Sequence, residues 1–475
     1  MSATPPAAPS SVAPWTDAAV REALGAAGPS REVVYTRVST DSREVADGDL
    51  YVALVGDRFD GHDFVEGALA KGARGAVVSS SWCSARSGGM QAPLYPVADT
   101  LVALGALARY RRIRLGAPVV GITGSSGKTT TKDLTAAALR SAKRVHATHG
   151  NRNNRVGMPL TLLSVPGDAE AVVLEMGTNE PGEIRTLAQI ARPDIGVVTT
   201  VGESHLEKLG SIAGVLEEKL DLLRGLASGG RCLVGDEPEE LVSRAREICS
   251  RLRVAGWTQR ADPDLRPENA RQDASGRYEF DWRGERVSLQ LVGRHAAADA
   301  MLALAIAEQL GVSPADAARG VSATGAHALR GEIRRVGSLT LIVDCYNSNP
   351  QSARAALDLL AGQDAARRVA VLGSMLELGT ESARLHREVL ASALERRFDL
   401  VVATGKFAEA AEATGAATRG GVITAADWQS AYPLLRDRLE GGEVVLLKAS
   451  RGIAMEGILP LFERDFVGPN VGRDA

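Results

Sequence analysis

A glycine-rich run in the first third of the chain has the residue types and spacing of a phosphate-binding loop. Residues 123–130 read Thr-Gly-Ser-Ser-Gly-Lys-Thr-Thr and follow an apolar stretch at 118–123. Glycines let backbone N–H groups turn toward phosphate oxygens, and the N-terminus of a following helix adds positive potential. The amine of Lys128 is expected to reach the β and γ phosphates of a nucleotide, and the hydroxyl of Thr129 to hold Mg²⁺. Ile122 stands where the common pattern has its first glycine. The context still predicts nucleotide binding by Gly124, Ser125, Ser126, Gly127, Lys128, Thr129 and Thr130.

Three further polar side chains could hold a metal ion or carry charge beside this loop. Glu175 ends an apolar stretch at 171–174, His205 follows another at 195–201, and Lys219 lies in a stretch of helical pattern at 212–226. The carboxyl ends of parallel strands line the cleft of an α/β domain, so Glu175 can point a carboxylate at Mg²⁺. The residues alone leave other roles open. Glu175 could cap the next helix, His205 could be a hydrogen-bonded structural residue, and Lys219 would be a solvated surface lysine.

Strands and helices alternate along the central part of the chain, which is the pattern of a parallel α/β sheet. We expect strands at 118–123, 171–174, 195–201 and 231–234 and helices at 128–141, 183–191, 212–226 and 296–310. A second run has expected strands at 339–343, 369–373, 400–403 and 444–447, separated by helices at 352–361, 381–396 and 428–439. This predicts a second, smaller doubly wound unit.

Ahead of these units, short strands at 50–54 and 76–79 are mixed with Gly-rich turns, and a helical stretch at 101–112 ends in basic residues. The chain is therefore expected to divide into four segments. They are a disordered tail at 1–14, an N-terminal domain at 15–112, a central domain at 113–330 and a C-terminal domain at 331–475.

Composition argues against several classes of protein. The chain has 475 residues and a formal net charge of −3, which argues against attraction of the whole protein to nucleic acid or to an anionic membrane. No apolar run approaches the roughly 20 residues of a membrane helix. The first fourteen residues lack the basic start and apolar stretch of a secretion signal, so we expect a cytosolic protein. No metal-site or redox spacing joins the four cysteines, which are expected to be reduced thiols: Cys83, Cys232, Cys249 and Cys345.

The order of these motifs resembles that of the Mur ligases, a family of ATP-dependent amide-forming enzymes. The shared features are the phosphate loop, the Glu-Met-Gly run at 175–177, and the His-Leu pair at 205–206 with a lysine fourteen positions after the histidine. The resemblance implies a three-domain α/β fold. A central phosphate-loop domain with a parallel sheet would carry a small N-terminal α/β domain and a C-terminal Rossmann-like domain.

The resemblance also implies ATP and Mg²⁺ as cofactors and a set of catalytic residues. Catalytic roles would fall on Lys128, His205 and Lys219, and metal binding on Thr129, Glu175, His205 and Lys219. Lys219 would be carbamylated. A CO₂ adduct turns the cationic side chain into a carboxylate, which can hold a hard metal ion.

Further stretches resemble the branch of this family that joins D-alanyl-D-alanine to UDP-N-acetylmuramoyl-tripeptide. They are Asp-Cys-Tyr-Asn-Ser-Asn-Pro-Gln-Ser at 344–352, Asn-Arg-Asn-Asn at 151–154 with Gly157 and Pro-Leu-Thr at 159–161, Asp-Ser-Arg at 41–43, Asp-Gly-His at 60–62, Leu-Gly-Ser-Met-Leu-Glu-Leu-Gly at 372–379 and Lys-Ala-Ser-Arg at 448–451. The implied further nucleotide contacts are His295, Asp299, Arg330, Asp344 and Tyr346. The implied substrate contacts are Thr40, Asp41, Ser42, Arg43, Asn151, Asn153, Asn154, Asn347, Asn349, Ser450 and Arg451. The implied partners are small molecules, a UDP-sugar peptide and a dipeptide or other amine, with no nucleic acid and no membrane insertion. A monomeric enzyme of the cytoplasm is expected.

The chain departs from the family pattern at several positions. Where the family has His-Asn-x-x-Asn-Ala, residues 295–300 read His-Ala-Ala-Ala-Asp-Ala. Ser374 stands in place of an aspartate and Ala449 in place of a glycine. The usual Gly-Arg-Met is replaced by Leu-Arg-Gly-Glu-Ile at 329–333, which leaves open whether Arg330 or Arg334 is the equivalent arginine.

Two other functions stay open at this point. The departures could mark a ligase recruited to join another amino acid or dipeptide to a different carboxylate, for example in specialised metabolism. A nucleotide-binding regulator or a kinase-like phosphotransferase would form no amide at all. The set of Glu175, His205 and Lys219 argues against this last class, because a mere nucleotide binder needs only the phosphate loop.

Overall fold

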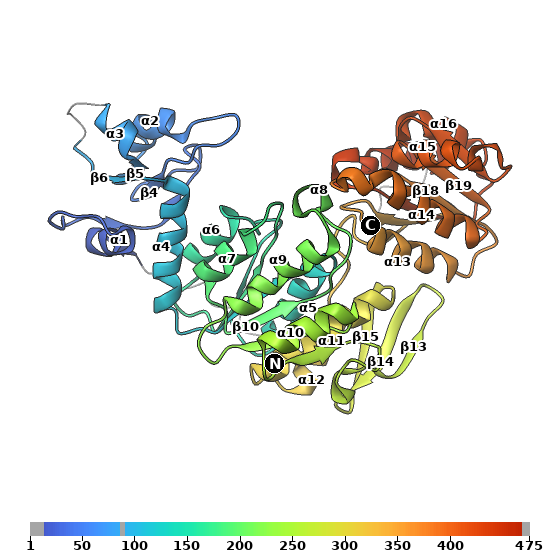
Figure 1. Cartoon of the computed structure of the whole chain (residues 1–475), viewed down its shortest axis with the longest axis horizontal. Coiled ribbons are helices and arrows are strands. Elements are labelled where there is room, and N and C mark those ends of the chain that lie inside the picture. The colour runs from blue at the N-terminus through green and yellow to red at the C-terminus, as the bar shows by residue number, and fades with distance from the viewer. Residues whose placement is uncertain (1–13, 86–90, 468–475) are drawn as a thin grey trace.

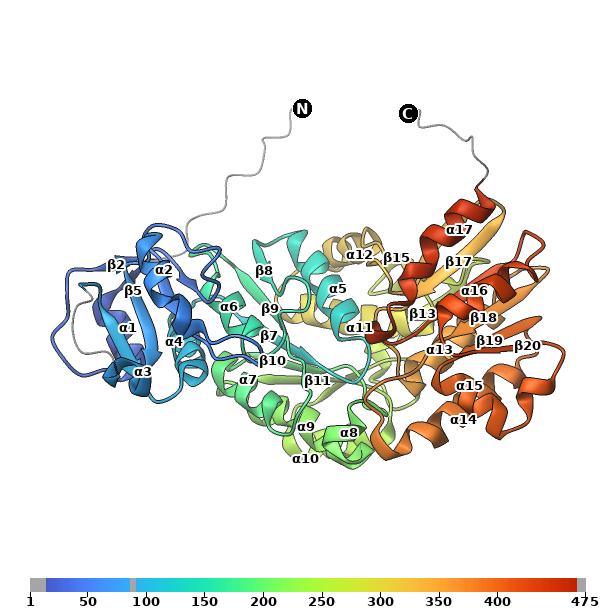
Figure 2. The ribbon, with the colours of Figure 1, turned by 90° about the horizontal axis from the view of Figure 1, so that it is seen from above.

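Three α/β parts follow one another along the longest dimension of the molecule (Figures 1 and 2). The computed structural model describes residues 14–85 and 91–467. Apart from Pro14, the tail expected at 1–14 therefore lies outside the described residues.

The N-terminal part is built on a four-stranded parallel sheet of order β3-β4-β5-β6. Its strands are β3 (Val38–Ser39), β4 (Leu50–Val52), β5 (Gly75–Ser79) and β6 (Leu94–Val97), and a short antiparallel pair adds β1 (Trp15–Thr16) and β2 (Val34–Tyr35). Its helices are α1 (Asp17–Leu24), α2 (Val65–Ala70) and α3 (Ser80–Ser84).

Helix α4 (Thr100–Arg114) joins this part to the next and packs on α6 (Gly157–Leu163) and α7 (Glu183–Ala191). A Cβ atom at Gly105 of α4 would lie 2.8 Å from Ile190 Cδ1, so this glycine allows the close approach of α4 to the central part.

The central part carries a six-stranded parallel sheet of order β12-β11-β10-β7-β9-β8. The strands are β7 (Val119–Thr123), β8 (Val145–Ala147), β9 (Ala171–Glu175), β10 (Ile195–Val198), β11 (Arg231–Gly235) and β12 (Arg253–Ala255). The remaining helices of this part are α5 (Lys128–Arg140), α8 (Leu206–Leu209), α9 (Ile212–Arg224), α10 (Glu239–Ile248), α11 (Arg294–Gln309) and α12 (Pro314–Ser322). Because β7 lies between β9 and β10, the loops that follow these three parallel strands meet at one edge of the sheet.

Several elements of the central part were not expected from the sequence, among them β8, β12, α6, α8 and α10. A three-stranded antiparallel sheet consists of β13 (Glu268–Gln272), β14 (Arg277–Trp282) and β15 (Glu285–Val292). In addition, α12 follows α11 and packs on α5 and β15.

The C-terminal part holds a second six-stranded sheet of order β16-β17-β21-β18-β19-β20. Only the β16–β17 pair is antiparallel. The strands are β16 (Glu332–Val336), β17 (Leu339–Asp344), β18 (Arg368–Leu372), β19 (Leu400–Thr404), β20 (Val422–Ala425) and β21 (Val444–Lys448). The helices are α13 (Pro350–Ala361), α14 (Ser382–Glu395), α15 (Lys406–Ala413), α16 (Trp428–Arg436) and α17 (Leu459–Phe466).

The expectation of four reduced thiols is wrong in the structure. Cys232 of β11 and Cys249, at the C-terminal end of α10, form a disulfide with a Cα–Cα distance of 6.3 Å. The chain between the two cysteines doubles back through α10 and brings them together, which their separation of 17 residues did not reveal. Cys83 and Cys345 are free.

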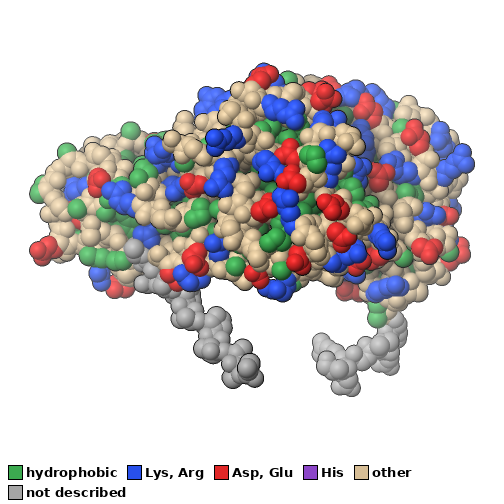
Figure 3. All heavy atoms as spheres, turned by 90° about the horizontal axis from the view of Figure 1, so that it is seen from below, with side chains coloured by type: hydrophobic (Ala, Val, Ile, Leu, Met, Phe, Trp, Pro, Cys, Tyr) green, Lys and Arg blue, Asp and Glu red, His purple; other side chains and the backbone are tan. Residues whose placement is uncertain are grey.

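Basic and acidic side chains are interspersed over the face of the molecule in Figure 3, in keeping with the nearly balanced charge. Within 14–85 and 91–467, no helix combines the length and the apolar character needed to cross a membrane.

Candidate active site

A cavity of about 670 Å³ opens where the carboxyl edges of the central and C-terminal sheets face each other. From the central part it is lined by the phosphate loop and by residues at the ends of β9, β10 and β11. The C-terminal part contributes the end of β17, the start of α13 and Lys448 of β21. Predicted residues from widely separated stretches meet here: Ser125, Ser126, Gly127, Lys128, Thr129, Thr130, Asn151, Asn153, Asn154, Glu175, His205, His295, Asp299, Arg330, Asp344, Tyr346, Asn347 and Asn349.

The phosphate loop has its glycines where no side chain fits. Gly124 has φ +152°, and a Cβ atom there would lie 2.0 Å from Thr199 Oγ1. Gly127 has φ +81°, and its Cβ atom would lie 2.4 Å from Asp299 Oδ1. The hydroxyl of Thr199 also donates a hydrogen bond to the Ser126 carbonyl at 2.5 Å. The loop is therefore packed tightly against β10 and α11, and larger residues would displace it.

Lys128 begins α5 at the base of the cavity. Its amine donates a hydrogen bond to the Gly124 carbonyl at 2.6 Å, which folds the side chain back along the loop. Burial lowers the pKa of Lys128, and the nearby carboxylate of Glu175 acts in the opposite direction. The amine thus lies beside the loop that would hold phosphates, where a positive charge is useful.

Asp299 lies behind the loop on α11 and is nearly fully buried. Its Oδ1 atom accepts a hydrogen bond from the hydroxyl of Thr131 at 3.1 Å. Burial raises the pKa of Asp299 to about 8. At neutral pH this side chain is therefore mostly protonated, and it resembles an asparagine in carrying no charge.

Glu175 ends β9 as a buried carboxylate with one free oxygen. Its Oε1 atom accepts a hydrogen bond from Asn153 Nδ2 at 2.8 Å, so the 151–154 loop is tied to the end of this strand. The Oε2 atom is buried and has no hydrogen-bond partner among the described residues. A buried oxygen without a partner lowers the stability of the fold unless a ligand or an ion interacts with it.

His205 also lines the cavity and immediately precedes α8. Its backbone has φ +53°, which is uncommon for a residue with a side chain. The Nδ1 atom lies 2.6 Å from Oε2 of Glu377, a residue of the C-terminal part. The sequence did not single out Glu377 as a site residue.

Lys219 is on α9, and its side chain is completely buried. The amine has no hydrogen-bond partner within the described part of the chain. Desolvation, and next the positive charge of Lys128, hold the pKa of Lys219 well below its usual value. The expectation from the residues alone, that Lys219 is a solvated surface lysine, is therefore wrong.

The available side chains could supply part of the coordination shell of a magnesium ion, with substrate and water supplying the rest. No group of three or more His, Cys, Asp or Glu residues in 14–85 and 91–467 could hold a metal on its own. Mg²⁺ commonly takes one or two carboxylates and fills its other positions with water and phosphate oxygens. Thr129, the free oxygen of Glu175 and His205 all border the cavity and could supply such a partial set.

At the C-terminal edge of the cavity, the buried lysine of β21 has two partners. Lys448 Nζ lies 2.8 Å from Asp344 Oδ2 and donates a second hydrogen bond to the Asn347 carbonyl at 2.8 Å. The guanidinium of Arg330 stacks on the ring of Tyr346, 3.9 Å from its centroid.

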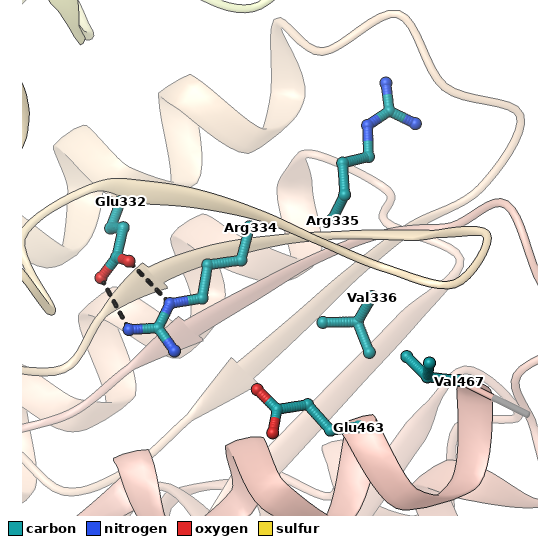
Figure 4. Close-up of a pocket in the computed structure, with 6 residues that line it drawn as sticks. All are labelled: Glu332, Arg334, Arg335, Val336, Glu463 and Val467. Carbon is teal, nitrogen blue, oxygen red and sulfur yellow. Dashed lines mark hydrogen bonds and ion pairs between the residues drawn. The ribbon is translucent and has the colours of Figure 1, made fainter. Parts of the chain in front are cut away.

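The two arginines left open by the sequence lie in different pockets. Arg330 lines the cavity. Arg334 lies in a separate shallow pocket, where it pairs with Glu332 at 2.7 Å (Figure 4).

Some predicted residues do not line this cavity. Thr40, Asp41, Ser42 and Arg43 lie in the N-terminal part, where Asp41 and Arg43 form an ion pair at 2.6 Å. Ser450 is buried and donates a hydrogen bond to the Ser348 carbonyl at 3.1 Å. The remaining three are Gly124, Lys219 and Arg451.

Most of the residues that depart from the family pattern lie away from the cavity. Ala296 and Ala449 are buried in hydrophobic cores. Ser374 Oγ accepts a hydrogen bond at 2.9 Å from the backbone N–H of Lys406, at the start of α15. Of the four changed side chains at 296, 299, 374 and 449, the cavity lining includes only that of Asp299.

Comparisons with known proteins agree with this geometry. The model of the Mur ligase family, catalytic domain, matches residues 34–112; that of the Mur ligase middle domain matches 122–307; and that of the Mur ligase, glutamate ligase domain, matches 329–451. A UDP-N-acetylmuramoyl-tripeptide–D-alanyl-D-alanine ligase of Bacillus subtilis (strain 168) is 36% identical over 443 residues, which span 90% of this chain and 93% of the relative. The ligase of the same name from Escherichia coli (strain K12) is 33% identical over 438 residues, spanning 90% and 94%.

Solved structures give the same answer. MurF from Acinetobacter baumannii aligns with a TM-score of 0.86 at 28% identity, covering 95% of this chain and 99% of that one. MurF ligase from Thermotoga maritima in complex with ADP aligns with a TM-score of 0.79 at 26% identity, covering 91% and 98%. These matches confirm the expected three-domain α/β fold and the resemblance on which it rests. The chain belongs to the Mur ligase family.

Proposed function

We propose that this protein is an ATP-dependent ligase that adds D-alanyl-D-alanine to UDP-N-acetylmuramoyl-tripeptide, a step of peptidoglycan synthesis. The observation that carries the proposal is the cavity itself. In this cavity the phosphate loop, His205 and Glu175, whose carboxylate has one oxygen without a partner, face a second α/β domain. The curated relatives cited above carry the name of this activity over nine-tenths of the chain.

The chemistry requires an anionic carboxylate to be brought against the anionic phosphates of ATP. The terminal carboxylate of the tripeptide attacks the γ-phosphate of ATP, giving an acyl phosphate and ADP. The amine of the incoming dipeptide then attacks the acyl carbon, phosphate leaves, and an amide forms. Repulsion among the anions dominates the barrier, so positioned positive groups lower it most. In this chain those groups are Lys128 and the N-terminal end of α5.

Thr129, Glu175 and His205 would hold Mg²⁺ at the phosphates. When bound, Mg²⁺ would neutralise charge on the β and γ phosphate oxygens. The protein's own contribution is to keep the carboxylate of Glu175 oriented through the hydrogen bond from Asn153.

Lys219 is suited to carbamylation. A neutral amine can attack CO₂, forming an N–C bond and releasing one proton, whereas an ammonium ion cannot. The depressed pKa of Lys219 favours the neutral amine. The resulting carbamate would be an anion that Lys128 attracts and that a second metal ion could use.

The three domains then divide the work. The N-terminal domain (15–112) would hold the UDP-sugar through Thr40, Asp41, Ser42 and Arg43, the central domain (113–330) would bind ATP, and the C-terminal domain (331–475) would bring the amine. The nucleotide contacts would include His295, Asp299, Arg330, Asp344 and Tyr346. Closure between the last two domains would exclude water from the acyl phosphate. With ATP and a UDP-linked compound as substrates, the expected compartment of the reaction is the cytoplasm.

The test is release of ADP and phosphate from ATP and Mg²⁺ with both proposed substrates, and with each omitted in turn. We expect full turnover only when both are present. Equal turnover after omission of the dipeptide, or with an unrelated carboxylate in place of the UDP-sugar peptide, would contradict the proposal. The departures at 296, 374 and 449 give no support to a recruited ligase, because their side chains are not among the cavity lining.

A further inference from the structure

His205 is held by a residue from the opposite domain. Its Nδ1 atom lies 2.6 Å from Oε2 of Glu377, which belongs to the loop between β18 and α14. The same two segments are also joined through the backbone, where the N–H of Glu207 donates to the Glu377 carbonyl at 3.1 Å. A Cβ atom at Gly379, where φ is +54°, would lie 2.9 Å from Glu207 Cα. The loop at 377–379 therefore packs directly on the start of α8.

Hydrogen-bond chemistry fixes which nitrogen of His205 remains available. An ionised carboxylate only accepts hydrogen bonds, so Nδ1 of His205 must carry the proton that it donates to Glu377. A neutral imidazole then keeps its lone pair on Nε2, which is the atom that can bind a metal ion. Carboxylates that hold metal-binding histidines in this way orient the ring and raise its basicity.

The backbone on both sides of the contact is strained. His205 has φ +53° and Glu377 has φ +63°, both in the left-handed region that residues with side chains rarely adopt. Such conformations persist where the surrounding structure holds them, and they cluster at functional sites. Here each strained residue presents its side chain to the other across the boundary between two domains.

We propose that Glu377 is a positioning residue that orients His205 for metal binding, so that the metal site is complete only when the C-terminal domain packs on the central domain. This inference rests on the proposed function, because it takes His205 as a metal ligand. It adds a physical link between domain closure and metal affinity. The metal would be bound firmly only in the closed enzyme, in which water is also excluded.

The chain offers a matched control four residues further on. Glu381 is a partly exposed glutamate that pairs with Arg384 at 2.6 Å, on the same side of the domain boundary. Affinity for Mn²⁺, used as a spectroscopic probe in place of Mg²⁺, is measured by electron paramagnetic resonance on the full chain with ADP. Wild type is compared with Glu377→Ala, Glu377→Gln, Glu381→Ala and His205→Ala, and thermal melting checks that each variant is folded.

We expect Glu377→Ala to weaken Mn²⁺ binding by about 10-fold or more. Glu377→Gln should recover part of the loss, because its amide oxygen can still accept the proton of Nδ1. Glu381→Ala should bind as wild type.

Three results would overturn the proposal, and each has a different meaning. Unchanged affinity in Glu377→Ala, together with a loss in His205→Ala, removes the positioning role and leaves the proposed function intact. Equal losses in the alanine and glutamine variants of Glu377 indicate a direct metal ligand instead. Unchanged affinity in His205→Ala removes the metal role of His205 itself, and the positioning role with it.

Discussion

The central and C-terminal domains each have a mostly parallel sheet and a buried lysine near the cavity. The two lysines differ in whether they have hydrogen-bond partners. In the C-terminal domain, Lys448 is satisfied by Asp344 and by the Asn347 carbonyl, each at 2.8 Å. In the central domain, Lys219 has no hydrogen-bond partner among the described residues, and neither has Oε2 of Glu175. A buried charge that is paired holds its neighbours in place, whereas an unpaired buried charged group is costly until something binds it. Lys448 thus fixes its part of the C-terminal edge, whereas the central edge keeps a buried amine and a buried carboxylate oxygen that charged ligands could satisfy.

The largest effect is expected at the phosphate loop. Lys128→Ala should reduce turnover by about 10³-fold or more, because it removes the positive charge beside the transferred phosphate. Circular dichroism should show an unchanged fold. Lys208→Ala, which removes an exposed lysine paired with Glu180 at 3.4 Å, is the control and should keep full activity. Normal turnover of Lys128→Ala would refute the proposal that ATP reacts at the central edge of the cavity.

The same substitution at the two buried lysines sharpens the contrast. Lys219→Met should lose about 100-fold or more in turnover and should melt at the same temperature as wild type or higher, because a buried amine without a partner becomes an apolar side chain. Wild-type activity should rise with added bicarbonate after CO₂ has been removed. Activity indifferent both to bicarbonate and to Lys219→Met would count against the carbamate.

Lys448→Met should behave in the opposite way. It leaves Asp344 without its cation and should lower the free energy of unfolding by about 2 kcal/mol. Chemical denaturation measures the change. A denaturation curve like that of wild type would mean that the pairing of Lys448 does not stabilise the C-terminal edge.

The smallest predicted effect is a pH dependence at Asp299. Its pKa rises from the ordinary 3.8 to about 8 in the folded protein, so between these values the folded state binds more protons than the unfolded state. Stability from this group is full at low pH and is lost as the pH rises toward 8. Asp299→Asn removes that loss, so its advantage in stability over wild type should be larger at pH 8 than at pH 5. An equal difference at both pH values would show that Asp299 does not titrate in this range.

Local patterns predicted the elements that carry the phosphate loop. The apolar strand β7, the glycines and the helix α5 are adjacent in the sequence, so their arrangement follows from spacing alone. The sheet of β13, β14 and β15 was missed because its strands lack the continuous apolar runs of a buried parallel strand. Strand β13 is mostly exposed, and β14 and β15 alternate buried residues with more exposed ones. The role of α12 was missed because its packing on α5 depends on the tertiary fold.

The same limit applies to the site. The burial of Lys219 depends on how α9 packs against α7 and β10, so the sequence of α9 by itself indicated a surface residue. The contact of His205 with Glu377 joins two loops from different domains, and no spacing within either loop could reveal it. The order of motifs did indicate the family, because the phosphate loop, Glu175, His205 and Lys219 succeed one another along a single domain.

The proposed reaction is tested most directly by mass analysis of the product formed from ATP, Mg²⁺, UDP-N-acetylmuramoyl-tripeptide and D-alanyl-D-alanine. We predict a UDP-N-acetylmuramoyl-pentapeptide, with one ADP and one phosphate released for each amide formed, and no such product from Lys128→Ala. ATP turnover without this product, or an amide formed only with a different amine or carboxylate, would contradict it.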